Sequence, residues 1–191
     1  TRTITVKARD TWGQPTQVED TGDTAVTGDE TCTRTGYATP SGGALTINLT
    51  AEESVMPNLC SVAVAQASVL SWTRNRYDGA SSHGGVTGPG FATETQQLVG
   101  SSTRTWRTSS TMTFDQHGRP TTVTDALGRT TTTTFTPSGI KAATKTEVTS
   151  PDPDGPGSAV PLTGTVYTDP RRNVETKRVT PAGETTEADR D

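Results

Sequence analysis

The stretch Phe114-Asp-Gln-His-Gly118-Arg-Pro-Thr-Thr-Val-Thr-Asp125-Ala-Leu-Gly128-Arg decides the fold, because it contains the same short phrase twice. Asp115 and Gly118 begin the first copy, and Asp125 and Gly128 begin the second copy ten residues later. An Asp side chain accepts hydrogen bonds from the backbone N–H groups that follow it, and a Gly three residues on can adopt the positive φ of a hairpin turn. The spacing fits one strand plus one turn, so the phrase predicts consecutive antiparallel β-hairpins.

The same phrase occurs near the start of the sequence. Asp10 and Gly13 match Asp115 and Gly118, and the following Pro, Thr, Val and Asp fall at the same offsets in both stretches. We interpret Asp10 and Gly13 as another turn of this kind. Variant turns are predicted at four further places, which are Pro137-Ser-Gly139, Pro181-Ala-Gly183, Tyr167 to Asn173, and the shortened Tyr77-Asp78-Gly79.

Composition leaves open whether the chain folds at all, and threonine decides the question. Leu, Ile, Val and Phe make up about 15% of the 191 residues, below the roughly 20% at which a packed core becomes doubtful. Thr, however, fills about a fifth of the positions, and β-branched residues favour strands. The net charge of only -4 is also unlike the high net charge of disordered chains. We therefore expect an ordered, all-β protein made of repeated antiparallel β-hairpins.

Strand-forming runs flank the predicted turns. Residues 111–114, 121–124 and 130–135 are rich in β-branched or aromatic side chains, and Pro15 and Pro120 stand at strand starts, where a missing N–H is tolerated. The aromatic residues are expected to pack across strands, and they include Trp12, Phe114, Phe135 and Tyr167.

Five segments follow from these patterns. Residues 1–20 form a repeat, residues 21–103 an irregular β insertion with both cysteines and a Gly-rich loop, and residues 104–150 the clearest repeats. Residues 151–161 are a loop rich in Pro and Gly, and residues 162–191 a degenerate repeat. Within the insertion, residues 61–69 alternate as a strand does, and residues 51–56 are the one stretch predicted to form a helical turn.

The repeat resembles the tyrosine-aspartate (YD) repeat of RHS proteins. Phe114 stands where the family usually has Tyr, and Tyr77-Asp78 carries the literal dipeptide. The Thr-rich composition and the region of Cys32 resemble the large secreted RHS-repeat proteins of actinobacteria. The clear resemblance covers residues 104 to 150, with weaker copies at 1–20 and 165–191.

The resemblance implies an architecture. RHS and YD repeats form β-ribbons that coil into a hollow shell, which encloses a C-terminal toxin domain in polymorphic toxins and Tc-type toxin complexes, or forms a barrel in adhesion proteins. The family's C-terminal core motif, where autoproteolysis occurs, is missing here, as is a toxin domain. The sequence begins and ends in mid-pattern, so we expect a portion of a longer chain.

Two cysteines are present, Cys32 and Cys60. The even count in an irregular segment of an expected exported protein favours a disulfide, which would close a loop of 28 residues. The alternative is a pair of free thiols in a reducing compartment.

Other residues could in principle bind a ligand or a metal ion or act in catalysis, but each has a simpler structural interpretation. Trp106, flanked by Arg104 and Arg107, either stacks on a glycan or packs as an ordinary aromatic residue. His83 and His117 belong to no zinc-binding or triad motif, and the Ser138 to Lys141 match to a Ser-x-x-Lys motif is accidental in a turn. Acidic residues could bind calcium, but solvated turn carboxylates are the better interpretation; they are Asp20, Asp23, Asp29, Glu30, Asp152 and Asp154.

The sequence thus predicts a non-catalytic structural module of a secreted or cell-surface RHS/YD-repeat protein, forming part of a β-shell around a toxin or cargo domain. Its expected partners are further repeats of the parent chain and the enclosed domain, with no cofactor, metal, nucleic acid or membrane span. A cell-surface adhesion or carbohydrate-binding module is the alternative. An acidic balance of 21 Asp and Glu against 17 Lys and Arg disfavours nucleic-acid binding, and no run of about 18 apolar residues occurs.

Overall fold

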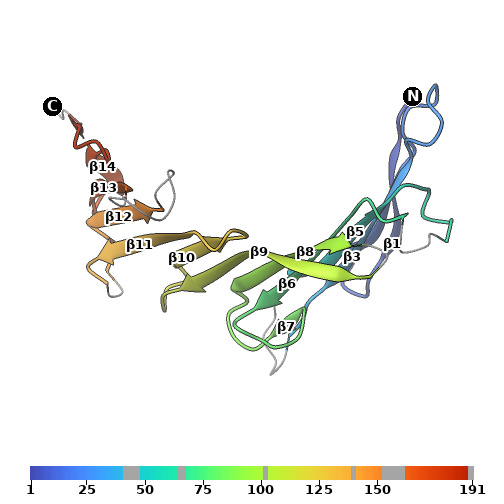
Figure 1. Ribbon diagram of the computed structural model, residues 1–191, viewed down its shortest axis with the longest axis horizontal. Helices are drawn as coiled ribbons and strands as arrows, with labels where there is room; N and C mark the ends of the chain where they lie inside the picture. Colours follow the sequence, from blue (N-terminus) through green and yellow to red (C-terminus); the bar gives the residue numbers. More distant parts are fainter. Residues whose placement is uncertain (41–47, 64–67, 101–102, 139–140, 152–161, 189–191) are drawn as a thin grey trace. The chain divides into compact units, whose positions relative to one another are not determined.

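The protein is all-β, as the repeats predict. The computed structural model describes residues 1–40, 48–63, 68–100, 103–138, 141–151 and 162–188, and every element labelled in Figure 1 is a strand. Thirteen strands within these residues form one open sheet, and the pairs whose register is resolved are antiparallel. Strand β9 (Thr105–Phe114) lies between β8 and β10 in the sheet.

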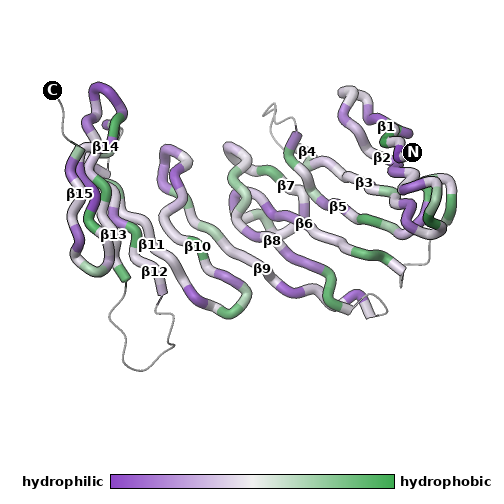
Figure 2. Tube along the Cα trace, turned by 90° about the horizontal axis from the view of Figure 1, so that it is seen from above, coloured by the Kyte–Doolittle hydropathy of each residue, from purple (hydrophilic) through white to green (hydrophobic). Residues whose placement is uncertain are grey.

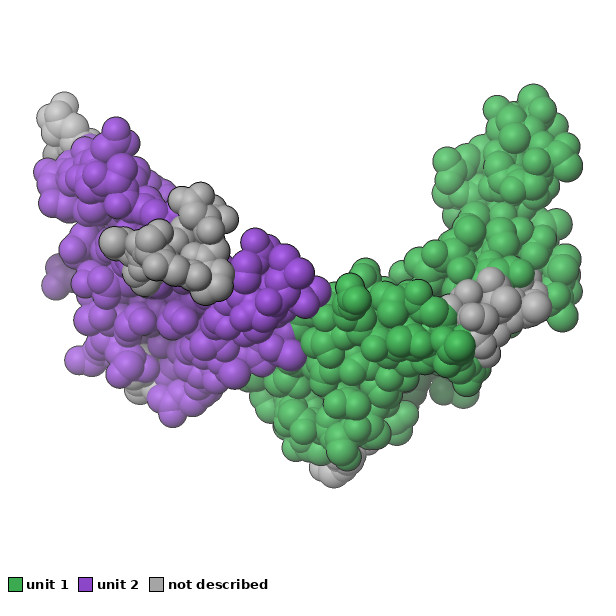
Figure 3. All heavy atoms as spheres, in the orientation of Figure 1, with its two compact units in different colours: residues 1–110 green, residues 111–191 purple. Residues whose placement is uncertain are grey.

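The chain divides into two compact units, which are residues 1–110 and residues 111–191 (Figure 3). In unit 1 the strands of the large sheet pair in the order β1 (Ile4–Arg9), β2 (Pro15–Asp20), β3 (Thr31–Tyr37), β5 (Thr50–Met56), β6 (Ser71–Tyr77) and β8 (Ala92–Gly100). A small parallel pair joins β4 (Thr39–Pro40) to β7 (Gly85–Val86). Residues 21–103 therefore supply four strands of the large sheet.

Unit 2 continues the same pattern with shorter connections. Its strands pair in chain order and are β10 (Pro120–Asp125), β11 (Thr130–Thr136), β12 (Lys145–Ser150), β13 (Leu162–Asp169), β14 (Val174–Val179) and β15 (Thr185–Glu187). Strands β2 and β10 begin at Pro15 and Pro120, as expected. The register places Thr122, Thr132, Thr149 and Thr163 directly opposite one another across four strands. This arrangement explains the threonine content, because Thr packs its methyl group on a pleated surface and keeps its hydroxyl hydrated.

The chain buries very little apolar surface. Among the described residues, the buried hydrophobic side chains are Cys32, Cys60, Tyr77 and Val86. The accessible surface is 11960 Å², whereas a compact monomer of 20.0 kDa exposes about 8,700 Å². Figure 2 shows the same feature, since most of the trace is hydrophilic or neutral and hydrophobic segments are short. A single-layer sheet leaves both faces of its strands near solvent, so hydrogen bonds between strands carry much of the order.

Three sequence-based expectations are wrong. Residues 61–69 do not form a strand where they are described, because Val62 N–H closes a turn by donating to the carbonyl of Leu59, and residues 63, 68 and 69 belong to no strand. Residues 51–56 belong to strand β5 and not to a helical turn, because β3 and β6 pair with them on both sides. Trp12 does not pack across strands, because it lies at the tip of the β1–β2 turn with 70% of its surface exposed. Residues 64–67 of the predicted alternating strand and residues 152–161 of the predicted loop, with Asp152 and Asp154, lie outside the described residues.

No helix in the described part of the chain has the length and the apolar character that crossing a membrane requires.

Candidate functional site

The Asp115 turn is held by one carboxylate and two backbone hydrogen bonds. Asp115 Oδ1 accepts the N–H groups of His117 (2.8 Å) and Arg119 (3.0 Å), while Oδ2 accepts Nε of Arg119 at 2.6 Å. Asp115 N–H donates to the carbonyl of Arg119, and Gly118 N–H donates to the carbonyl of Asp115. Gly118 has a φ of 76°, in the left-handed region. The carboxylate thus fixes the turn from inside.

The other two Asp-x-x-Gly turns repeat this network. Asp125 Oδ1 accepts the N–H groups of Leu127 and Arg129, and its Oδ2 accepts Arg129 Nε at 2.7 Å. Asp10 makes the same bonds with Trp12 and Gln14, whose side-chain amide replaces the guanidinium at 2.8 Å. Gly128 and Gly13 have φ values of 78° and 82°. Local hydrogen bonding therefore explains why the phrase recurs.

Two variant turns keep part of the network. Thr180 replaces Asp, and its hydroxyl accepts the N–H of Glu184, while Gly183 keeps a φ of 85°. Asp169 accepts the N–H of Arg171, and Asn173 occupies the left-handed position with a φ of 52°. Both variants fall where the sequence predicts them.

Hydrogen bonding lowers the pKa values of the turn carboxylates. The side chain and then the backbone N–H of Arg129 lower the pKa of Asp125 below its ordinary value. Desolvation alone would raise the pKa of Asp115, but the backbone and side-chain hydrogen bonds of Arg119 outweigh it, and the net shift is downward. The ionised form of each carboxyl therefore supports the folded turn.

In unit 2 the Asp115 turn also reaches a neighbouring strand. The guanidinium of Arg119 lies over the ring of Phe135 in β11, with 4.2 Å between its central carbon and the ring centroid. A shallow groove is lined there by these two residues together with Asp115 and threonines of β10 and β11. The cation–π contact therefore links the Asp115 turn to strand β11.

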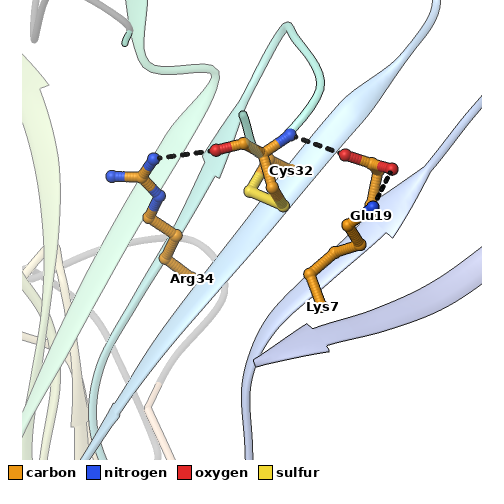
Figure 4. The surroundings of a disulfide bond; sticks show 5 residues. Lys7, Glu19, Cys32 and Arg34 are labelled. Atoms are coloured by element: carbon orange, nitrogen blue, oxygen red, sulfur yellow. Dashed lines mark hydrogen bonds and ion pairs between the residues drawn. A yellow bond between two sulfur atoms is a disulfide. The ribbon is translucent and has the colours of Figure 1, made fainter. Parts of the chain in front are cut away.

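A disulfide joins Cys32 in β3 to Cys60 in the loop after β5 (Figure 4). The N–H of Cys60 donates to Glu19 Oε2 at 2.9 Å, and Lys7 Nζ lies 3.2 Å from Glu19 Oε1. A guanidinium nitrogen of Arg34 reaches the carbonyl of Cys60 at 3.4 Å. Glu19 is buried with 8% exposed, and its hydrogen bond and ion pair compensate for its removal from water. The disulfide therefore secures a loop over the sheet of unit 1.

Asp78 organises the Gly-rich loop of unit 1. Its carboxylate accepts the backbone N–H groups of Gly88, Gly90 and Phe91 at 2.9 to 3.1 Å. The loop that it closes carries Val86, which is 1% exposed. The shortened turn expected at Tyr77-Asp78-Gly79 is therefore the anchor of a longer loop.

A cluster of two arginines and two tryptophans lies in unit 1, and we refer to Trp72, Arg74, Arg104 and Trp106 as the arginine–tryptophan cluster. The two indole rings meet edge to face, with centroids 5.5 Å apart and an interplanar angle of 74°. The central guanidinium carbon of Arg74 lies 3.9 Å from the centroid of Trp106, and that of Arg104 lies 5.5 Å from the centroid of Trp72. Arg74 thus covers the ring of Trp106, which the sequence offered as a surface for stacking on a sugar.

Charged and polar side chains surround the cluster on the same face of the sheet. Arg74 stands directly opposite Glu52 in β5 and Gln96 in β8, and Arg76 stands opposite Glu94, with which it forms an ion pair at 3.0 Å. Arg74 Nε donates to Gln96 Oε1 at 2.7 Å. Burial first, and then the charge of Arg76, lowers the pKa of Arg74. The site is therefore a partly desolvated group of cations.

Sequence reasoning missed Trp72 and Arg74. A signal was present, because Trp72, Arg74 and Arg76 alternate as Arg104 and Trp106 do, and both stretches read as strands with these residues on one face. Their meeting depends on the pairing of strands far apart in the chain.

Of the remaining candidates, His83 borders the cluster, because Gln96 Oε1 near its ring also accepts Arg74 Nε; the others make contacts elsewhere. His117 is exposed at its turn, where its ring approaches Gln116, and His83 lies 3.3 Å from Gln96. Arg2 pairs with Asp20, and Asp29 accepts the N–H of Asp23. Within the described residues, no three His, Cys, Asp or Glu side chains are arranged to hold a metal ion. Gly139 and Ile140 of the Ser138 to Lys141 stretch lie outside the described residues.

No protein-family model matches this chain, and no curated protein matches it significantly.

Proposed function

We propose that this chain is a non-catalytic structural module of an RHS/YD-repeat protein, and that its hairpins form part of a β-shell around a toxin or cargo domain. One observation carries the proposal. The turns at Asp10, Asp115 and Asp125 share a single hydrogen-bond network although the residues at their tips differ. Such agreement is expected of repeats whose task is to build a regular wall.

The thin core supports a role as a wall. Strands of the sheet pair with their sequence neighbours, so the wall lengthens by one strand for each added turn. Thr-rich faces carry hydroxyl groups and offer little apolar surface to which an unfolded cargo chain could adhere. In this proposal the module contains its cargo without binding it tightly.

The disulfide supports secretion or display at the cell surface. Disulfides persist in oxidising compartments and are rare in the cytosol. The sulfur atoms of Cys32 and Cys60 belong to residues that are only 1% and 8% exposed, which protects the bond from exchange with thiols.

Electron microscopy of the longest native polypeptide that contains this segment tests the proposal. A hollow, closed particle with density inside is the expected result. A solid rod, a fibre or an open ribbon would contradict containment and would favour a stalk or an adhesion module.

A further inference from the structure

The two guanidinium groups of the arginine–tryptophan cluster have unused hydrogen-bonding capacity. Within the described residues, neither Arg74 nor Arg104 forms an ion pair, whereas Arg76 beside them is neutralised by Glu94. The one side-chain hydrogen bond of Arg74 there uses Nε, so its terminal nitrogens are available. A planar guanidinium with both terminal nitrogens available matches an oxyanion such as a carboxylate or a sulfate.

The balance of charge around the cluster favours an anionic ligand. Three cations, Arg74, Arg76 and Arg104, face two carboxylates, Glu52 and Glu94, and Glu94 is already engaged by Arg76, Gln96 and Thr108. The positive charge is local, because the whole chain carries a net charge of -4. A polyanion such as nucleic acid binds through a basic stripe that contacts many phosphates. The cluster instead fits one or two oxyanions on a small ligand.

The rings identify the rest of the ligand. Trp72 and Trp106 are half-buried and meet edge to face, and each indole has a guanidinium group over its ring. The edges of the indoles that the guanidinium groups leave uncovered can contact the C–H face of a pyranose ring, while the charged nitrogens hold an acidic substituent. An extended peptide is disfavoured, because it would add to an open strand edge, and strand β6, which carries Trp72 and Arg74, is paired on both sides.

We propose that the arginine–tryptophan cluster binds a saccharide that carries an oxyanion, with Arg74 and Arg104 holding the carboxylate or sulfate and the two indoles contacting the sugar ring. This site is independent of the shell proposal, since it uses residues of unit 1 alone. Because Arg74 lies over the ring of Trp106, the ligand contacts guanidinium nitrogens there. A neutral sugar therefore does not stack on this face of Trp106.

Tryptophan fluorescence tests the proposal in a Trp12→Phe background, where the remaining tryptophans are Trp72 and Trp106. The probes are a glucuronate-containing tetrasaccharide, a sulfated disaccharide and the carboxyl-reduced, neutral form of the tetrasaccharide, at equal ionic strength. We expect a saturable change with an acidic saccharide, and the stronger of the two identifies the oxyanion. The neutral form is expected to bind at least about tenfold more weakly.

Three variants locate the site. Arg74→Gln and Arg104→Gln are each expected to weaken binding by about tenfold or more. Arg104 is exposed, so its replacement leaves the fold intact and keeps the test valid if Arg74→Gln unfolds. Arg107→Gln is the matched control, because Arg107 is an exposed neighbour of Trp106 on the opposite side of β9, and it should bind like the parent.

Several results would overturn the proposal. They are a fluorescence change equal to that given by sodium acetate or sodium sulfate alone, equal binding of the neutral saccharide, or binding that the Arg107 variant loses as fully as the Arg104 variant. Absence of a saturable change with both acidic probes would also overturn it. Tighter binding of a peptide or an oligonucleotide than of either saccharide would assign the cluster to another class of ligand.

Discussion

Gly128 shows how one residue sets a hairpin. Its φ is 78°, and a Cβ added there would meet no atom within 4 Å. Replacement by Ala therefore strains the backbone without a clash, and we expect Gly128→Ala to lower the free energy of unfolding by about 1–2 kcal/mol. Urea denaturation measures the change.

The control is Gly128→Asn, because Asn tolerates the left-handed region and Asn173 already occupies it in the Asp169 turn. The Asn variant is expected to lose less stability than the Ala variant. Equal losses would show that the conformation of the glycine is not what the turn requires.

The lowered pKa of Asp125 predicts that the free energy of unfolding depends on pH. Its pKa in the folded protein lies below the ordinary value of 3.8, chiefly because of the hydrogen bond from Arg129. A group whose pKa is lower when folded stabilises the fold fully above its unfolded value, and this stabilisation is lost as the pH falls from about 3.8 through the folded pKa. We expect Asp125→Asn to be less stable than the wild type at pH 6 and to lose less stability between pH 4 and pH 2.

Arg129→Gln provides the comparison, since it removes the leading cause of the shift and keeps the carboxyl group. Its curve of unfolding free energy against pH should lie between those of the wild type and of Asp125→Asn. Parallel curves for all three proteins would contradict the coupling.

At the level of elements, the disulfide is a contribution to stability that can be removed by substitution. It spans a sequence separation of 28 residues and secures the loop over β3. In the chain-entropy model such a bond stabilises by about 3–4 kcal/mol. We expect the Cys32→Ser, Cys60→Ser double variant to lose that amount in equilibrium denaturation. A loss below about 1 kcal/mol would mean that packing against Glu19 and Arg34 holds the loop by itself.

The Gly-rich loop gives a second prediction at this scale. Asp78→Asn removes the charge that accepts three backbone N–H groups. Hydrogen exchange should accelerate at Gly88, Gly90 and Phe91 and stay unchanged in β1 and β2. Asp23→Asn is the matched control, since Asp23 accepts the N–H of Ala25 in a different loop and its replacement should leave the three amides protected.

Elements were predictable from sequence where the signal is local. Asp115 accepts a backbone N–H of its own turn and Gly118 supplies the positive φ of the same turn, so the two residue types predict the hairpin. Residues 51–56, where the sequence predicts a helical turn, form a strand because Ser54 pairs with Arg34 on one side and with Trp72 on the other, and this pairing overrides local preference. The arginine–tryptophan cluster had only a partial local signal, the alternation of its residues, because its assembly joins strands that are about 30 residues apart.

The molecule as a whole should unfold with a small change in heat capacity. Unfolding of ordinary proteins raises the heat capacity by about 12–15 cal/mol/K per residue, or about 2.3–2.9 kcal/mol/K for 191 residues, through exposure of apolar surface. This chain buries few apolar side chains within its described part. Differential scanning calorimetry is expected to give less than about 2.3 kcal/mol/K, and a value within the ordinary range would show a larger apolar core.

The turn network makes the tip residue replaceable. Trp12, His117 and Leu127 occupy the same position in three copies, and in each copy the Asp carboxylate and the backbone hold the turn while the tip side chain is exposed. Selection on the tips is therefore uncoupled from selection on folding. A combinatorial library that places any residue except proline at these three positions should express and fold, which makes the hairpin ends suitable for displaying new recognition sequences; proline is excluded because the tip N–H donates to the Asp carboxylate.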